Sequence, residues 1–353
     1  MLYELYDIEM SPVSASVILG LVLGLVFGAA AQISRFCLRR GVVGPKPERT
    51  AALGTWLTAL AAAILGTQLL VGGGYLDLSE HRLAASELPW LAIIVGGALF
   101  GAGMVLTRGC VSRLTVLTAT GNLRALTVLI LFAIAAHATL KGLLAPLRTS
   151  LGAVTVDIGE ASTAAGLPGG TTLWAALIVL GLVYLVARSG AGPRQIAFGA
   201  IIGLLVPLGW FGTGVLLMDE FDPIPLASLS FTAPWADSLF WTIASTAIPA
   251  GFGTGLVGGV LVGSFLSAAA RRELALVSFT SPSETLRYSG GAMLMGVGGV
   301  LAGGCTVGAG LSGVAGLNVA AGLALASIIA GAIATDRALA GRNAPAGSTV
   351  PAE

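Results

Sequence analysis

The stretch GAGMVLTRGC, residues 101–110, returns as GVGGVLAGGC at residues 296–305, with six identities in ten positions. Each copy is an apolar, glycine-rich run that ends in a cysteine, and both follow the order G-x-G-x-V-L-x-x-G-C. Gly121 and Gly316 then stand at the same distance from the two cysteines. This self-similarity predicts an internal repeat in which each copy places a cysteine at a break in apolar sequence.

The composition predicts a polytopic membrane protein. Hydrophobic residues make up 56% of the 353 residues and charged residues only 10%, whereas soluble domains carry about 25% charged residues. Nine apolar segments are each about long enough to cross a hydrocarbon core of ~30 Å as a helix. They are 15–34, 51–71, 89–107, 124–145, 171–187, 196–217, 239–269, 286–303 and 319–335. The segment 239–269 is too long for one upright helix, and Pro249 with the following GFGTG predicts a kink or break within it.

The repeat and the span count together predict an all-α fold of two inverted halves. The halves cover residues 13–148 and 193–340, with four spans each, and the linker helix 171–187 joins them. Inverted repeats of this kind typify transporters whose substrate site lies near the membrane midplane at broken helices. Irregular backbone survives at membrane depth only where it is buried or lines a cavity. We therefore expect re-entrant loops at the glycine-rich breaks, which are 35–50, 108–122 and 303–318.

The basic residues predict an N-terminus outside and a C-terminus inside, because this orientation places nearly all Lys and Arg on inner loops. The chain begins with MLYELYDIEM, which is acidic and lacks the basic region of a signal peptide. The first helix is therefore expected to be a retained span.

Three cysteines, Cys37, Cys110 and Cys305, each lie in one of the glycine-rich breaks. A buried cysteine is often only a small apolar packing residue, but packing residues should not fall at all three breaks. The sequence contains no C-x-x-C pair, which argues against a thioredoxin-like site or a zinc ribbon. Three thiols could also hold a soft metal such as Cu(I), yet no further ligands stand nearby. We expect a functional set of thiols without a metal or a cofactor.

Polar groups around the cysteines suit an anion. Arg35, Arg108 and Arg113 serve either as inner-loop anchors or as forked donors to an anion, together with backbone N–H groups at helix N-termini. The neutral candidates for the same substrate-binding site are Gln32, Thr306, Gly109 and Gly304. His137 lies within the fourth expected span, where packing is a more common role for histidine than a proton relay.

Three motifs resemble the signatures of the YeeE/YedE family of bacterial inner-membrane sulfur transporters. They are QISRFCLRRG at 32–41, RGCVSRLTVLTATGNLRAL at 108–126 and GGAMLMGVGGVLAGGCTVGAGLSG at 290–313. The resemblance implies thiosulfate uptake, with one essential cysteine in each motif, here Cys37, Cys110 and Cys305. It also implies a TusA-like sulfur-carrier protein as partner. In a bacterial inner membrane, the orientation predicted from the basic residues makes the N-terminus periplasmic and the C-terminus cytoplasmic. Because some relatives are linked to selenium, a selenium species is an alternative substrate.

Two other classes of function remain open from the sequence. In a membrane thiol oxidoreductase or sulfurtransferase, a cysteine would attack the substrate and carry a persulfide, and Arg108 beside Cys110 is the candidate for activating it. In a structural subunit the cysteines would only fill space. We expect a transporter rather than an enzyme, because thiosulfate is a dianion with a soft sulfur, and weak thiol contacts let an ion enter and leave.

The second half offers no counterpart of the first cysteine. The expected counterpart follows the span that begins at 196 and reads GWFGTGVL at 209–216, without a cysteine or a charge. The proposed set of thiols therefore has three members.

Overall fold

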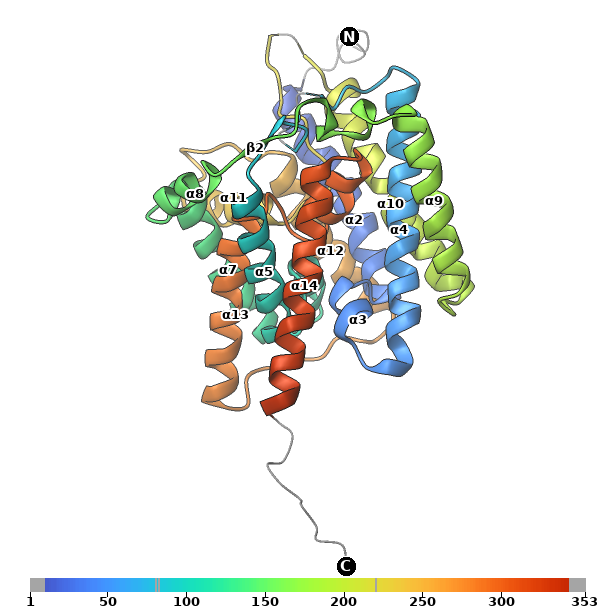
Figure 1. Cartoon of the computed structure of the whole chain (residues 1–353). Helices are drawn as coiled ribbons and strands as arrows, with labels where there is room; N and C mark the ends of the chain where they lie inside the picture. The colour runs from blue at the N-terminus through green and yellow to red at the C-terminus, as the bar shows by residue number, and fades with distance from the viewer. Residues whose placement is uncertain (1–9, 80, 82, 220, 343–353) are drawn as a thin grey trace, which may run out of the picture.

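The computed structural model describes residues 10–79, 81, 83–219 and 221–342. The described residues form a bundle of helices that run between an upper and a lower face (Figure 1). The long helices are α2 (Pro12–Ser34), α4 (Lys46–Gly72), α5 (Trp90–Leu106), α7 (Leu123–Lys141), α9 (Gly170–Ala187), α10 (Pro193–Phe211), α12 (Phe252–Ala270), α13 (Pro282–Leu301) and α14 (Val319–Arg342). The shorter helices are α3 (Leu38–Val43), α6 (Val111–Ala119), α8 (Ala145–Gly152), α11 (Thr232–Ile243), the 3₁₀ turns η1 (Gly159–Ser162) and η2 (Ala164–Gly166), and the π-helical turns η3 (Gly212–Leu216) and η4 (Gly308–Gly313). The strands β1 (Glu87–Leu88) and β2 (Val156–Asp157) pair antiparallel near the upper face (Figure 1).

Eight helices of the described residues are long and apolar enough to cross a membrane. This confirms an all-α, multi-pass protein, with one span fewer than the nine expected. The expected span 286–303 falls in α13, whose polar first turns, PSETLRYS, lower its hydropathy. The expected span 239–269 is interrupted, because α11 ends at Ile243 and α12 begins at Phe252. The break lies at Pro249, where the sequence indicated it.

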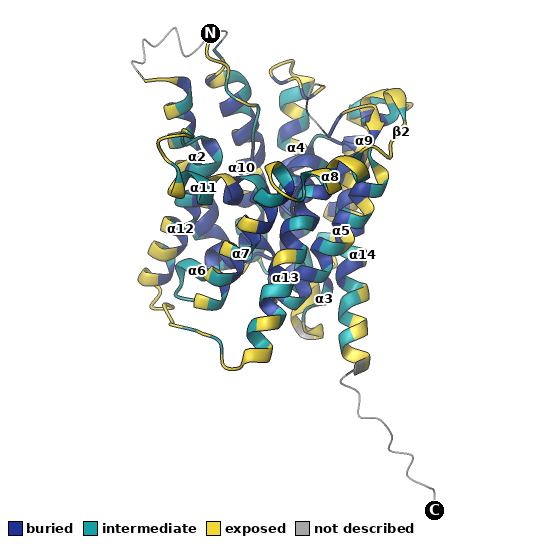
Figure 2. Ribbon diagram, turned by 90° about the vertical axis from the view of Figure 1, so that its left-hand side faces the viewer, coloured by how far each residue is buried: buried dark blue, intermediate teal, exposed yellow. Residues whose placement is uncertain are grey.

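The helix bundle encloses a continuous core, and Figure 2 shows buried residues concentrated where the helices face one another. Helix α9 lies at one edge beside α4 (Figure 1), and only its Ala175 and Leu182 are buried. Helix α2 begins near the upper face and α14 ends at the lower face (Figure 1). The chain ends themselves, residues 1–9 and 343–353, to which the orientation prediction refers, lie outside the described residues.

Glycines set the closest helix contact, which joins α2 to α12. Gly20, Gly24 and Gly28 of α2 face α12, and a Cβ at Gly24 would collide with the carbonyl oxygen of Leu256. In return, a Cβ at Gly259 of α12 would collide with the carbonyl oxygen of Leu21. Small residues at four-residue spacing let two helix backbones touch, which is how helices associate where lipid provides no hydrophobic driving force.

Four stretches of the chain share one order of elements: a long helix, a short helix and a second long helix. They are α2, α3 and α4; α5, α6 and α7; α10, α11 and α12; and α13, η4 and α14. In the third stretch the sequence GWFGTGVL at 209–216 continues α10 into the π-helical turn η3. After Leu216 the chain leaves the helix, and its described residues form no further helix until Phe231, which is the N-cap of the short helix α11.

Candidate functional site

The three cysteines are free, deeply buried thiols that occupy the same kind of backbone position. Cys37, Cys110 and Cys305 are 5%, 1% and 0% exposed, respectively. Cys37 is the N-cap of α3, and Cys110 is the N-cap of α6. The carbonyl oxygen of Cys305 accepts a hydrogen bond from the N–H of Ala309 at 2.9 Å, so this residue also begins a helical turn. Each thiol thus lies at a helix start, where backbone N–H groups favour negative charge.

A left-handed residue stands two positions before each cysteine and ends the preceding long helix. Arg35 has φ 54°, Arg108 has φ 60° and Gly303 has φ 75°. For an arginine this conformation costs about 1–3 kcal/mol, and such strain persists mainly at functional sites. The same chain reversal therefore presents each of the three thiols.

Packing brings the first two motifs into contact. The Sγ atoms of Cys37 and Cys110 are 3.9 Å apart, and Ser112 Oγ lies 3.3 Å from the sulfur of Cys110. The sulfur of Cys305 has a different partner, because it accepts a hydrogen bond from the N–H of Gly308 at 3.3 Å. A side-chain acceptor bonded to the third residue of a helical turn is the usual N-cap arrangement. All three thiols belong to one buried cluster.

Aromatic side chains connect the two sites within that cluster. Phe36, next to Cys37, packs edge-on against Phe27 with ring centres 6.3 Å apart, and Phe27 contacts Phe231 at 5.3 Å. Just before Phe231, the carbonyl oxygen of Leu229 accepts a hydrogen bond of 2.7 Å from Ser312 Oγ in the third motif. These ring contacts and one hydrogen bond to the backbone therefore link the region of the Cys37–Cys110 pair to the Cys305 loop.

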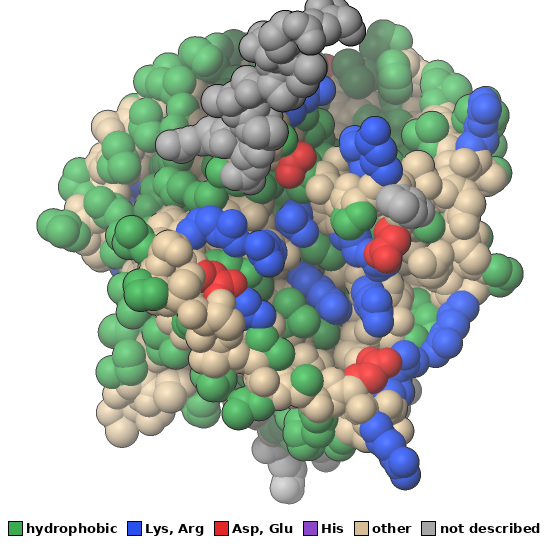
Figure 3. Space-filling model, turned by 90° about the horizontal axis from the view of Figure 1, so that it is seen from below, with side chains coloured by type: hydrophobic (Ala, Val, Ile, Leu, Met, Phe, Trp, Pro, Cys, Tyr) green, Lys and Arg blue, Asp and Glu red, His purple; other side chains and the backbone are tan. Residues whose placement is uncertain are grey.

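The predicted basic residues separate into two groups. Arg113 is half-buried and lies three residues after Cys110 in the first turn of α6, whereas Arg35 and Arg108 are exposed. Figure 3 shows Lys and Arg side chains gathered on the lower face. In the described part of the chain none of the three predicted arginines forms a direct ion pair.

Gln32 has a structural partner at each end of its amide. Its Nε2 donates to Glu273 at 2.6 Å, and its Oε1 accepts from Ser267 Oγ at 3.0 Å. Hydrogen bonds from Arg271 and then Gln32 hold the pKa of Glu273 below its ordinary value, so this carboxylate stays charged and fixes the amide. Gln32 thus ties α2 to the loop after α12.

The other neutral candidates form the turns around the cysteines. Thr306 is 1% exposed, and Gly109 and Gly304 are buried. The carbonyl oxygen of Gly109 accepts from Thr107 Oγ1 at 3.1 Å. A Cβ at Gly304 would lie 2.7 Å from the amide nitrogen of Ala309, so this tight turn requires glycine.

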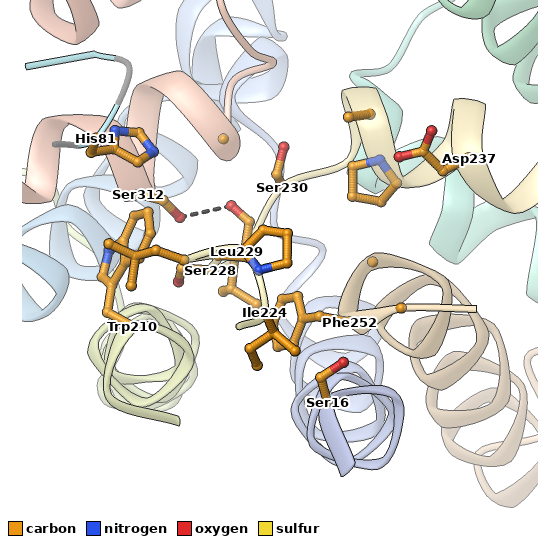
Figure 4. A pocket seen from close by; sticks show the side chains of 18 of the residues that line it. Ser16, His81, Trp210, Ile224, Ser228, Leu229, Ser230, Asp237, Phe252 and Ser312 are labelled. Carbon is orange, nitrogen blue, oxygen red and sulfur yellow. Dashed lines mark hydrogen bonds between the residues drawn. The ribbon is translucent and has the colours of Figure 1, made fainter. Parts of the chain in front are cut away.

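A cavity of about 430 Å³ reaches the third motif from the upper side. It lies among the first turns of α2 and α12 and the extended segment 224–230, and Gly308, whose N–H binds Cys305, is in its wall. Its polar side chains are Ser16, His81, Trp210, Ser228, Ser230, Asp237 and Ser312 (Figure 4). Sequence reasoning missed this cavity, because its lining comes from six separate parts of the chain. The alternating serines of ASLS, 227–230, between two apolar spans were the available signal.

Comparison with known proteins gives a consistent result. A profile described as sulphur transport matches residues 33–334. The thiosulfate transporter TsuA of Escherichia coli K12 is 27% identical over 314 residues, which cover 83% of this chain and 86% of that protein. The thiosulfate transporter TsuA of Spirochaeta thermophila is 25% identical over 314 residues, which cover 84% of this chain and 90% of the relative. The resemblance inferred from the three motifs is therefore confirmed.

Proposed function

Because the chain belongs to the sulphur transport family, we propose that it carries thiosulfate, or a closely related sulfur-containing anion, across the membrane by way of its three thiols. The observation that carries the proposal is the arrangement of the cysteines. Three separate motifs each place a buried sulfur at a helix start. Helix N-termini offset the lost hydration of an anion, and neutral S–H groups are soft, weak donors that can release it again.

The positions of the cavity and the thiols support one order of contacts, which we propose. The anion enters the cavity and meets Cys305 through the turn at Gly308. It then passes the side chains around Phe27 to reach Cys110 and Cys37, where Arg113 contributes its charge. With the N-terminus outside, the cavity faces the periplasm and the basic lower face meets the cytoplasm. A TusA-like carrier protein would receive the sulfur at that basic face.

We further propose that residues 13–148 and 193–340 are inverted repeats that bring two re-entrant loops together from opposite faces. Asn122 begins α7 after Gly121, which has φ 100°, and Asn318 begins α14 after Leu317, which has φ 56°. Asn122 lies twelve residues after its cysteine, and Asn318 lies thirteen after its own. With the two asparagines aligned, Leu317 rather than Gly316 takes the position of Gly121. The extra residue then falls in the stretch that contains the π-helical turn η4, and a π turn is how a helix accommodates one insertion.

Reconstituted uptake tests the function. Purified protein in liposomes should accumulate labelled thiosulfate, and unlabelled thiosulfate should compete for uptake whereas an equal concentration of sulfate should not. Selenosulfate in the same competition would reveal a selenium substrate. Liposomes that stay at the background of protein-free vesicles would refute transport of thiosulfate. A persulfide on Cys37 or Cys110 after exposure to thiosulfate would favour the sulfurtransferase instead.

Arg113 should matter far more than other arginines of the lower face. We expect Arg113→Ala to lower the rate of thiosulfate uptake about tenfold or more, since a hydrogen bond to a charged group contributes about 1.5–3 kcal/mol. Arg271→Ala is the matched control, because Arg271 is exposed and pairs with Glu273. Arg108→Gly tests the charge of Arg108 separately from its backbone, because glycine readily adopts the left-handed conformation that Gly303 shows in the third motif. Equal uptake by the Arg113 and Arg271 variants would reduce Arg113 to a topological anchor.

A further inference from the structure

An acidic side chain lies in the wall of the cavity that the proposed function assigns to an anion. Asp237 of α11 is the only carboxylate among the described residues that line it. Figure 4 shows Asp237 on the far side of Ser230 from His81 and Trp210. The side chain is exposed and takes part in no ion pair of the described residues. The carboxylate therefore faces the space that the substrate would occupy.

The dimensions make this carboxylate an obstacle to a dianion. A sphere of 430 Å³ is about 9 Å across, close to the Debye length of ~8 Å at physiological ionic strength. A charged Asp237 would thus repel an anion anywhere in the cavity with little screening. Neutralising the carboxylate by protonation removes the repulsion, so the anion and a proton favour each other's binding.

The surroundings of Asp237 already favour the neutral acid. Partial desolvation raises the pKa of Asp237, and Lys141 and His137 of α7 act in the opposite direction on that pKa. Helix α12 contains no titratable residue, and α13 contacts α11 near Gly299, far along the helix from its charged residues Glu284 and Arg287. His81 faces the cavity from the opposite wall. These are the groups from which any pH response of the cavity must come.

We propose that Asp237 links substrate binding to protons: the anion occupies the cavity together with one proton taken up by this carboxylate. This inference rests on the proposed function, and it adds that binding of the anion depends on pH. His137 has a separate role, because its ring stacks on Phe240 with ring centres 4.6 Å apart. Thiosulfate itself does not titrate near neutral pH, so the proton must be bound by the protein.

The test is equilibrium binding of labelled thiosulfate to the purified protein between pH 5.5 and 8. Above the pKa of the carboxyl group, one linked proton raises the apparent Kd about tenfold per pH unit. We expect this slope for the wild type and a flat profile for Asp237→Asn, which retains high affinity at pH 8. Asp237→Glu should restore the slope. Asp222→Asn is the matched control, because Asp222 is exposed but does not line the cavity.

Two histidine variants separate the remaining sources of a pH effect. Protonated histidine would also attract an anion, so His81→Gln and His137→Gln are each measured, and both should keep the tenfold slope whatever their affinity. A slope that survives in Asp237→Asn or vanishes in a histidine variant would overturn the proposal. Binding by the wild type that depends on sodium but not on pH would also overturn it. No binding at any pH would refute the proposed function itself, which a flat but measurable profile would not.

Discussion

Replacing any one of Cys37, Cys110 and Cys305 by alanine is expected to lower thiosulfate uptake at least about 30-fold, since a lost hydrogen bond to a charged group costs about 2 kcal/mol. Each thiol lies at its own helix start, and the Cys305 sulfur is separated from the pair by the side chains around Phe27. Neither sulfur of the pair is therefore placed to replace Cys305, and we expect the anion to need both sulfurs of the pair, which lie 3.9 Å apart. Alanine keeps the apolar packing of these buried positions, so the loss should appear in uptake rather than in the amount of protein.

Serine distinguishes a transport role from a capping role. In Cys305→Ser the hydroxyl can still accept a hydrogen bond from the N–H of Gly308, and serine is among the best N-cap residues. The variant should therefore melt at or above the wild-type temperature in detergent. Its uptake should nevertheless recover poorly, because a hydroxyl is a harder partner than a thiol for the terminal sulfur of thiosulfate. Full uptake by Cys305→Ser would assign this cysteine to structure alone.

Alkylation supplies a second measurement on the same residues. Thiosulfate should slow the modification of at least one thiol, whereas sulfate at equal ionic strength should not. A well-expressed triple Cys→Ala variant with undiminished uptake would contradict the role of all three cysteines and return them to simple packing.

The sequence predicted the features of this fold that depend on local pattern. Apolar segments of span length, the break at Pro249 and the interruptions at the three cysteines were all visible, because lipid requires long apolar helices and excludes irregular backbone. The span 286–303 was predicted from the apolar C-terminal part of α13. The polar residues in the first turns of α13 lower its mean hydropathy, so α13 is not among the eight helices that are apolar enough to cross a membrane. The count therefore differed at the segment with the weakest hydropathy.

The geometry of the site depends on packing between distant segments and was not predictable in the same way. No spacing in the sequence shows that the sulfur atoms of Cys37 and Cys110 lie 3.9 Å apart. Nor does any spacing show that the side-chain amide of Gln32 donates a hydrogen bond to Glu273. The sequence contained only a weak indication that each thiol lies at the start of a helix. The residues two positions before the cysteines are Arg35, Arg108 and Gly303, and only one of them is a glycine. An arginine, unlike a glycine, gives no hint of a left-handed backbone.

The second large effect is expected at the contact between α2 and α12, where two neighbouring glycines make a matched pair. Gly259 faces α2, and a Cβ there would collide with the carbonyl oxygen of Leu21. Gly258 precedes it in the same helix, and a Cβ there would meet nothing within 4 Å. Both positions have the same helix propensity, so their variants differ only in what the new side chain meets.

Gly259→Leu should prevent the protein from folding, while Gly258→Leu should fold as well as the wild type. Adding a few methylenes to a close-packed interior destabilises the folded protein by about 1–3 kcal/mol even when the neighbouring side chains can shift. A backbone carbonyl on a packed helix cannot shift without moving the helix. Moving α2 outward would also separate Gly20, Gly24 and Gly28 from their contacts, and Cys37 follows directly after that helix. Size-exclusion chromatography in detergent, followed by thermal melting of the monodisperse fraction, measures the difference. If the two variants accumulated and melted alike, the backbone contact between α2 and α12 would not be what holds the first thiol in place.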